Sequence, residues 1–389
     1  MNVLTSPEYD LLLDAVAPRP TARVDHRRWD REQWDRAVQA AQWHRLAPLL
    51  FRHIQARQPV PADVLAALEE AYLTNAARNL FVSASLRNVL DALASAQIPA
   101  MPLKGAALVE TVCPDPALRE MLDLDVLVPA DRLDAANAAL AEIGYRPQYA
   151  GAGSRADHHH DPALITDEQI VAVELHHHIA LVGERSHFDV DELWQRARPA
   201  AGHLMPSHED LLLHVCLHFT RNRLGGSYRR RTTGGALSQV CDIAWIVGGA
   251  TVNWDALARA ARAYRLDTRV FLALFAAREL GVAVPVGALQ ALRPPGFDPR
   301  IGRRLVALRV LRDGQHLPVR SVRWMLAPGR DVLAHGWGAD REGAMSLARA
   351  YMRRARAQVP LAGPALRRPW AVVQDYRLNG QIQALEQRE

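Results

Sequence analysis

Hydrophobic side chains recur along the first part of this chain with the spacing of amphipathic helices. Between residues 1 and 96 they return every three or four positions, so Trp34, Val38 and Ala41 fall near one face. Ser6 followed by Pro7 is a typical helix start, because proline is tolerated at the first helical position. The pattern predicts an N-terminal helical region over residues 1–96.

After residue 96 the pattern changes to short apolar runs and strict alternation, which are typical of strands. Gly144 is expected to end a helix, because glycine accepts the backbone conformation found at helix C-termini. The expected strands cover residues 98–105, 122–129, 145–150, 161–166 and 169–181, with the last two forming a hairpin pair. The expected helices cover residues 106–113 and 130–144. Together they predict an α/β unit over residues 97–182.

Helical spacing returns after this unit and continues toward the C-terminus. The expected helices cover residues 206–224, 236–248, 253–264 and 267–280. The predicted fold class is α+β, with a small mixed-sheet core flanked by N-terminal and C-terminal helical regions. The predicted domains are an N-terminal helical region (1–96), the α/β core (97–205), a helical region packing on the core (206–292) and an arginine-rich C-terminal helical region (293–389).

Composition adds a basic bias to this picture. The 389 residues are 49% hydrophobic, enough for a sizeable core, and carry a formal net charge of +5. A basic chain favours anionic partners such as nucleotides, nucleic acid or acidic peptides. The alternative is the coding bias of a GC-rich genome, because Lys104 is the single lysine among 47 lysines and arginines.

Cysteine spacing and hydropathy exclude several protein classes. Cys113, Cys216 and Cys241 form no CxxC pair, so neither a zinc knuckle nor a disulfide framework is indicated. The start of the chain has neither the basic segment nor the apolar segment of a secretory leader. No stretch reaches the ~18 apolar residues that a membrane span needs. We therefore expect a cytoplasmic protein with no membrane partner.

Two carboxylates in the stretch REMLDLDVLVP are the first candidates for chemistry. On a strand Asp123 and Asp125 point to the same face, while Leu124 and Val126 point to the other face and into a core. Neighbouring carboxylates repel each other unless a cation lies between them, and Mg²⁺ favours a few carboxylates together with substrate phosphates. The pair therefore suits a nucleotide-bound magnesium. The alternative is an acidic pattern on an exposed strand.

Glu174 is the third candidate carboxylate. It lies in IVAVELHHH, where Val173 and Leu175 alternate with Glu174 and His176. If this strand neighbours residues 123–128 in an antiparallel sheet, three carboxylates converge and can hold two metal ions. His176 shares the face of Glu174 and could orient that carboxylate or contact substrate. The alternative is a solvated Glu174 on an edge strand.

These stretches together resemble a known family. LKGAAL, LREMLDLDVLV, a helix ending in IGY, and VELHHHI follow one another as in the uncharacterised nucleotidyltransferase family of the polymerase-β-like nucleotidyltransferase superfamily. The resemblance covers about residues 97–182 well and 207–248 loosely. It implies a minimal nucleotidyltransferase fold. It also implies transfer of a nucleoside monophosphate from an NTP to an acceptor, with release of pyrophosphate.

The resemblance also implies roles for particular residues. Asp123 and Asp125 match the metal-binding pair, and Glu174 matches the third, base-like carboxylate, so all three are expected to be catalytic and to hold metal. The usual opening Gly-Ser of the superfamily is replaced by Lys104-Gly105. The expected cofactor is Mg²⁺, with Mn²⁺ as the alternative.

Lys104, Gly105, Arg119 and His176 are the expected nucleotide-binding residues. Lys104 and Gly105 stand where a strand meets a helix, and a helix N-terminus favours anions. Gly105 lets the backbone approach phosphate, and lysine is a compact charge suited to a β- or γ-phosphate. Arg119 could hold the same phosphates or position Asp123. The alternatives are a lysine kept by chance and a surface arginine.

Histidine clusters and a basic loop are weaker signals. DHHHD at 157–161 and HHH at 176–178 do not predict a zinc site, because consecutive strand residues face opposite ways. Each cluster is expected to be a polar edge of the site. The glycine-flanked basic loop at 225–235 could close over an anionic substrate, or could be a solvated connector.

The leading hypothesis is a magnesium-dependent nucleotidyltransferase that binds ATP or another NTP. Its acceptor is a small molecule, a peptide or RNA. One alternative is a catalytically degenerate nucleotide- or RNA-binding regulatory module. Another is a toxin-like nucleotidyltransferase that modifies tRNA, which the arginine-rich C-terminal region favours.

Overall fold

A computed structural model describes residues 6–17, 24–57, 59–148, 159–167, 171–179, 188–200, 202–224 and 234–311. These residues fall into two compact units. One consists of Asn2–Phe219 with Gly235–Pro294, and the described part of the other consists of residues 220–224, 234 and 295–311. Most of the basic loop (225–233) and the arginine-rich stretch 312–389 lie outside the described residues. The domain boundaries at residues 96, 205 and 292 stay predictions.

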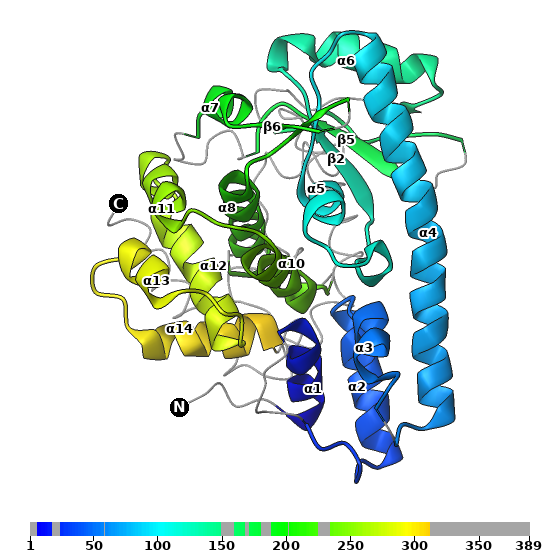
Figure 1. Ribbon diagram of the computed structural model, residues 1–389, viewed down its shortest axis with the longest axis vertical. Coiled ribbons are helices and arrows are strands. Elements are labelled where there is room, and N and C mark those ends of the chain that lie inside the picture. The colour runs from blue at the N-terminus through cyan, green and yellow to red at the C-terminus, as the bar shows by residue number, and fades with distance from the viewer. Residues whose placement is uncertain are drawn as a thin grey trace, which may run out of the picture. The chain divides into compact units, whose positions relative to one another are not determined.

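The N-terminal region is helical, as expected. Its helices are α1 (Pro7–Val16), α2 (Arg31–Trp43), α3 (Ala47–Ile54) and α4 (Ala62–Ser95). Helix α2 starts at a capping box, in which the Asp30 carboxylate accepts from the Gln33 backbone N–H at 2.8 Å and the Gln33 side chain accepts from the Asp30 N–H at 3.0 Å. Helix α4 is 34 residues long and contacts α3 with one part and α6 with another (Figure 1).

A five-stranded mixed sheet follows and confirms the predicted fold class. The strands lie in the order β1-β2-β5-β4-β3, and the β4–β5 pair is antiparallel, as expected for a hairpin. Gly144 has a φ of +92° and ends the helix that precedes β3, as predicted. The strands are β1 (Met101–Pro102), β2 (Asp123–Leu127), β3 (Arg146–Pro147), β4 (Leu164–Ile165) and β5 (Ala172–His176).

The expected antiparallel pairing of the two carboxylate-bearing strands was wrong. Strands β2 and β5 are parallel, and Asp125 is paired with Glu174. Helix α6 (Leu133–Glu142) follows β2 and leads to β3. Strand β4 is antiparallel to β3, and β5 is antiparallel to β4, so β5 runs in the same direction as β3. The long connection through α6, β3 and β4 lets β5 lie parallel to β2 without a tight turn between them.

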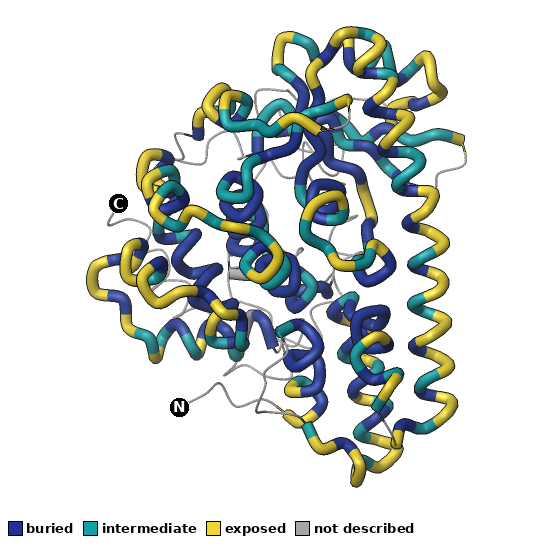
Figure 2. Tube along the Cα trace, viewed as in Figure 1, coloured by how far each residue is buried: buried dark blue, intermediate teal, exposed yellow. Residues whose placement is uncertain are grey.

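The core of the sheet lies on the face opposite the carboxylates. Strand residues Leu124, Val126, Val173 and Leu175 are fully buried. Figure 2 shows buried stretches in dark blue where the strands of the sheet cross. These strand residues belong to one apolar cluster with residues of α4 and α6, which therefore cover this face. The helical residues of this cluster include Val82, Leu86, Val89, Leu90, Leu93, Leu133, Ala136 and Leu140.

Further helices complete the larger unit. Helix α8 contacts α5, α10, α11 and α12, and α5 also contacts β2. These elements are α5 (Lys104–Thr111), α7 (Val190–Gln195), a hairpin of β6 (Arg198–Pro199) and β7 (Leu204–Met205), α8 (His208–Phe219), α10 (Ala236–Gly249), α11 (Trp254–Ala263), α12 (Asp267–Glu279) and α13 (Val286–Leu292).

The smaller unit contains α14 (Pro299–Val306), flanked in sequence by the π-helical turn Ala307–Leu311, and a second π-helical turn at Thr220–Leu224. Asp298 caps α14 by accepting a hydrogen bond from the Arg300 backbone N–H at 2.8 Å. None of the helices in the described ranges of either unit has the length and apolarity required to cross a membrane.

Candidate active site

Strand β2 presents Asp123 and Asp125 on the face away from the apolar core. The alternation that buries Leu124 and Val126 against α4 and α6 puts both carboxylates on the other side. Their surroundings differ, because Asp123 lies at the exposed start of β2 whereas Asp125 is only 3% exposed. The two carboxylates therefore have different electrostatic environments.

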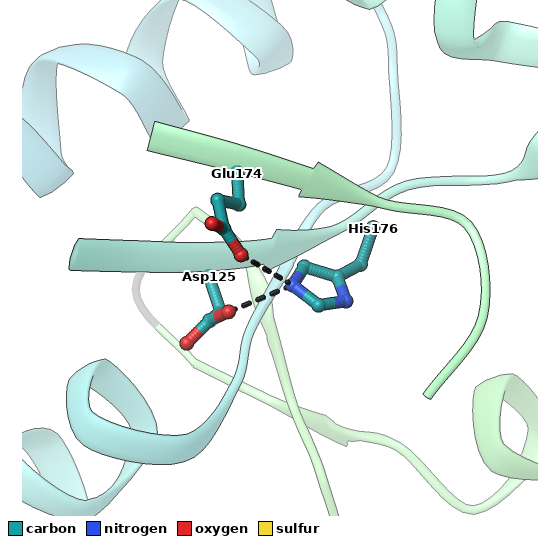
Figure 3. Close-up of side chains that lie close together, drawn as sticks. All are labelled: Asp125, Glu174 and His176. Carbon is teal, nitrogen blue, oxygen red and sulfur yellow. Dashed lines mark hydrogen bonds and ion pairs between the residues drawn. The ribbon is translucent and has the colours of Figure 1, made fainter. Parts of the chain in front are cut away.

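Strand β5 brings Glu174 and His176 beside Asp125 (Figure 3). Glu174 is directly opposite Asp125 in the parallel register and is half-buried. The fully buried His176 has its Nε2 atom 2.7 Å from Asp125 Oδ1 and 3.6 Å from Glu174 Oε2. One imidazole nitrogen therefore lies between two carboxylates from neighbouring strands.

Lys104 reaches the same carboxylate from the start of α5. Its Nζ atom is 2.6 Å from Asp125 Oδ1, and both side chains are mostly buried. The backbone N–H of the preceding Leu103 donates to the Asp125 carbonyl oxygen at 2.9 Å, which fixes the helix start against β2. Lys104 itself has a φ of +43°, a left-handed conformation that is strained for a residue with a side chain. Strain of this kind persists where surrounding contacts hold it.

The charges around Asp125 shift the pKa values of Asp125 and Asp123 in opposite directions. Burial alone would raise the pKa of Asp125, but the Lys104 ammonium and the His176 imidazole hold it well below its usual value. Although Asp123 as a residue stands at the exposed start of β2, desolvation of its carboxylate and the charge of Asp125 raise its pKa to about 6. Burial alone would raise the pKa of Glu174, but the neighbouring His176 imidazole, with Nε2 3.6 Å from Oε2, lowers it.

Arg119 is held by a partner that the sequence did not indicate. Its Nε and Nη2 atoms donate to Oδ1 and Oδ2 of Asp242 at 2.8 and 3.0 Å, a bidentate pair. Asp242 lies in the middle of α10, 123 residues along the chain from Arg119. The Asn79 side chain of α4 donates to the Arg119 carbonyl oxygen at 2.8 Å.

Gly105 makes room for this arginine. A Cβ atom at position 105 would collide with Arg119 Nη1 and would lie 3.1 Å from Cζ. The packing of Arg119 therefore requires a glycine at position 105, in addition to the expected approach of phosphate to this backbone. Arg119 and Lys104 have different ion-pair partners, Asp242 and Asp125 respectively.

Replacing Asp242 with alanine is expected to destabilise the fold strongly. The change leaves the Arg119 guanidinium, only 18% exposed, without its bidentate partner. Removing one member of a buried pair typically costs about 3–5 kcal/mol. Urea unfolding should show this loss, and the Arg119→Ala/Asp242→Ala double variant should recover part of it. A loss below about 1 kcal/mol, the value of a surface pair, would contradict the structural role.

The structure gathers most of the sequence-predicted site residues at one edge of β2. Direct contacts link Lys104, Asp125, Glu174 and His176. Asp123 lies on the same strand face, two residues before Asp125. The structure also adds His160, with Nε2 3.7 Å from Glu174 Oε2 and its ring centroid 5.0 Å from that of His176. The expectation of a polar site edge in DHHHD agrees with this placement, although Asp157 and His158 lie outside the described residues.

The residues present suit a metal ion. Among the described residues, Asp125, Glu174 and His176 each offer a ligand atom, and these atoms lie within 4.8 Å of one another. Carboxylate oxygens are ligands for Mg²⁺ and Mn²⁺, and Asp123 adds a further carboxylate on the same face. The donor set of this chain therefore fits a divalent cation.

Comparison with known proteins gives one match. The profile of a family described as "Uncharacterised nucleotidyltransferase" matches residues 30–281, well over half of the chain. The matched stretch includes Lys104, Asp125, Glu174 and His176 together with Asp242. Neither the curated proteins nor the solved structures include a significant match.

Proposed function

The chain belongs to the uncharacterised nucleotidyltransferase family, and on this premise we propose that it transfers a nucleoside monophosphate from an NTP to an acceptor and releases pyrophosphate. The observation that carries the proposal is the pairing of Asp125 with Glu174 across two parallel strands, with Asp123 on the same face. Converging carboxylates beside an ammonium group suit a triphosphate with its divalent cation.

Each site residue has a role in this proposal. Asp123, Asp125 and Glu174 would hold Mg²⁺ or Mn²⁺, which when bound supplies positive charge against the phosphates. Glu174, whose side chain is 24% exposed against 4% for Asp125, accepts the proton of the attacking acceptor group. His176 is fully buried and lies against the Asp125 and Glu174 carboxylates. Arg119 and Gly105 shape the start of α5, from which Lys104 reaches the phosphates.

Lys104→Ala is expected to weaken NTP binding about 10- to 100-fold. The ammonium lies at the N-terminus of α5 beside the carboxylate group, where it can contact a β- or γ-phosphate. A charge-assisted hydrogen bond is worth roughly 1.5–3 kcal/mol, and about 1.4 kcal/mol is tenfold. The dissociation constant of a non-hydrolysable NTP measures the effect. Lys104→Arg keeps the charge but changes its shape and should retain part of the binding. Normal binding by both variants would remove Lys104 from the nucleotide site.

Label transfer tests the proposed function directly. The full chain is incubated with each of the four α-³²P-labelled NTPs, Mg²⁺ or Mn²⁺ and a cell extract, and the label is traced to protein, RNA or small molecules. The same reaction with γ-³²P-labelled NTP is the control, because nucleotidyl transfer sends that label into pyrophosphate. Label in an acceptor from the α position alone supports the proposal. Label from the γ position, or no metal-dependent transfer, contradicts it.

A nucleotide-binding module without catalysis is the second candidate. The Lys104–Asp125 ion pair favours it, because the ammonium neutralises the carboxylate that would hold a metal. In the label-transfer experiment this candidate predicts tight NTP binding and no transfer. The leading proposal also includes a cytoplasmic location. The label-transfer experiment would identify the acceptor class and the preferred base.

A further inference from the structure

His176 is placed differently from a residue that only supports its neighbours. Its side chain has no exposed surface, and its Nε2 atom faces Asp125 Oδ1 at 2.7 Å and Glu174 Oε2 at 3.6 Å (Figure 3). Both oxygens come from residues that converge on this nitrogen from neighbouring strands. The nitrogen is therefore central to the group of potential ligand atoms.

The other ring nitrogen of His176 determines what Nε2 can offer. Nδ1 is 3.3 Å from the carbonyl oxygen of His178, a hydrogen-bond acceptor, so Nδ1 carries the proton. A neutral imidazole in this tautomer presents a lone pair at Nε2, and this arrangement is typical of metal-bound histidine. A lone pair cannot face a carboxylate oxygen at 2.7 Å without a cation between them. That cation is either a proton on Nε2 or a metal ion.

We propose that His176 is a metal ligand through Nε2, together with Asp125 and Glu174, so that the site binds a first-row transition ion such as Mn²⁺ in preference to Mg²⁺. This inference rests on the proposed function, because it names the cation of that same site. Mg²⁺ is bound in proteins almost entirely by oxygen, whereas first-row transition ions accept imidazole nitrogen as well. One nitrogen among two carboxylates therefore shifts selectivity toward the transition ion.

The surroundings of His176 support this assignment. The His159 and His160 rings lie with their centroids 5.1 and 5.0 Å from that of His176, so other imidazoles pack around it. Adjacent ligands on an ion with bonds of ~2.1 Å stand about 3 Å apart when they meet at right angles. The separation of 2.7 Å between His176 Nε2 and Asp125 Oδ1 is close to that value. These two atoms therefore have a spacing that suits a shared ion, which would displace the Lys104 ammonium, 2.6 Å from the same Asp125 oxygen, toward a bound phosphate.

Pulsed electron paramagnetic resonance of the full chain loaded with Mn²⁺ tests the inference. A nitrogen bound to Mn²⁺ gives ¹⁴N hyperfine coupling, which oxygen ligands do not. The wild-type protein should show this coupling, and ¹⁵N-histidine labelling should change its pattern. His176→Gln should remove the coupling and weaken Mn²⁺ binding at least tenfold. Mutating a residue that only supports a metal ligand already weakens metal binding ~10- to 100-fold, so loss of a ligand should cost at least that much. Mg²⁺ affinity should change less.

His160→Gln is the matched control, because it removes a neighbouring imidazole whose Nε2 is 3.7 Å from Glu174 Oε2. It should keep the coupling. Mn²⁺ bound by the wild-type protein without ¹⁴N coupling would overturn the inference and leave the proposed function standing, with a proton between His176 and Asp125. Coupling lost in His160→Gln but kept in His176→Gln would also overturn it.

No divalent binding, together with no metal-dependent transfer, would instead remove the proposed function. If His176→Gln does not fold, the wild-type and ¹⁵N-labelled spectra decide whether a histidine binds the metal.

Discussion

Asp125→Asn is expected to abolish nucleotidyl transfer. The change keeps the shape of the side chain but removes the charge that faces Lys104 and His176 and that would hold the metal. A bound metal stabilises the charge of the transition state by several kcal/mol, which corresponds to more than about a thousandfold in rate. Transfer of label from an α-labelled NTP, at saturating Mg²⁺ or Mn²⁺, measures the loss. Transfer at more than a tenth of the wild-type rate would exclude Asp125 from the mechanism.

The same variant should also be less stable than the wild-type protein without metal. Because Lys104 and His176 hold the pKa of Asp125 well below its usual value, its ionised form stabilises the fold at neutral pH. Asp123→Asn is the matched control, with the same chemical change two residues away on the same strand face. The pKa of Asp123 is raised to about 6, so its ionised form destabilises the fold at pH 7.

Thermal unfolding at pH 7 in the presence of a chelator should therefore separate the two variants. Asp125→Asn is expected to lower the melting temperature and Asp123→Asn to raise it, although both should lose transfer. Equal shifts in the same direction would show that Lys104 and His176 do not stabilise Asp125 selectively. Asp131→Asn, a change at an exposed residue outside the site, should alter neither transfer nor melting temperature.

Glu174→Gln is expected to reduce the rate of transfer by about 10²–10⁴-fold, the typical contribution of a general base. Glu174 is half-buried and lies opposite Asp125, where its carboxylate can take a proton from an acceptor group. The loss should be larger if the residue also holds metal. Single-turnover rates at saturating NTP measure the chemical step without the contribution of binding.

Glu192→Gln is the control for this variant, because Glu192 lies on α7 and bonds Arg196 and Tyr264 instead of the site residues. It should keep the wild-type rate. A loss below tenfold in Glu174→Gln would point to a different base. His160 is then the next residue to test, since its Nε2 is near Glu174 and part of its side chain is exposed.

Sequence periodicity alone determined which elements form and which faces they present. Alternation around Asp123 and Asp125, and around Glu174, predicted two strands with carboxylates on one face and apolar residues on the other, and β2 and β5 have this arrangement. A strand-to-helix junction at Lys104 and Gly105 was predicted in the same way, although α5 begins at Lys104, two residues before the predicted helix start. The end of a second helix at Gly144 was also predicted. Such features can be predicted because they depend on residues a few positions apart.

Only the tertiary structure decided how these elements meet. Strand direction between β2 and β5 was predicted wrongly, because it depends on the number of chain reversals between them. The partner of Arg119 is Asp242, 123 residues away, and no local pattern indicates that pair. The contacts of Asp125 with Lys104 and His176 likewise join three separate elements. The local sequence determines which side chains share a face of a helix or strand. Which charged side chains from distant parts of the chain become partners depends on how the whole core packs, because that packing brings them together.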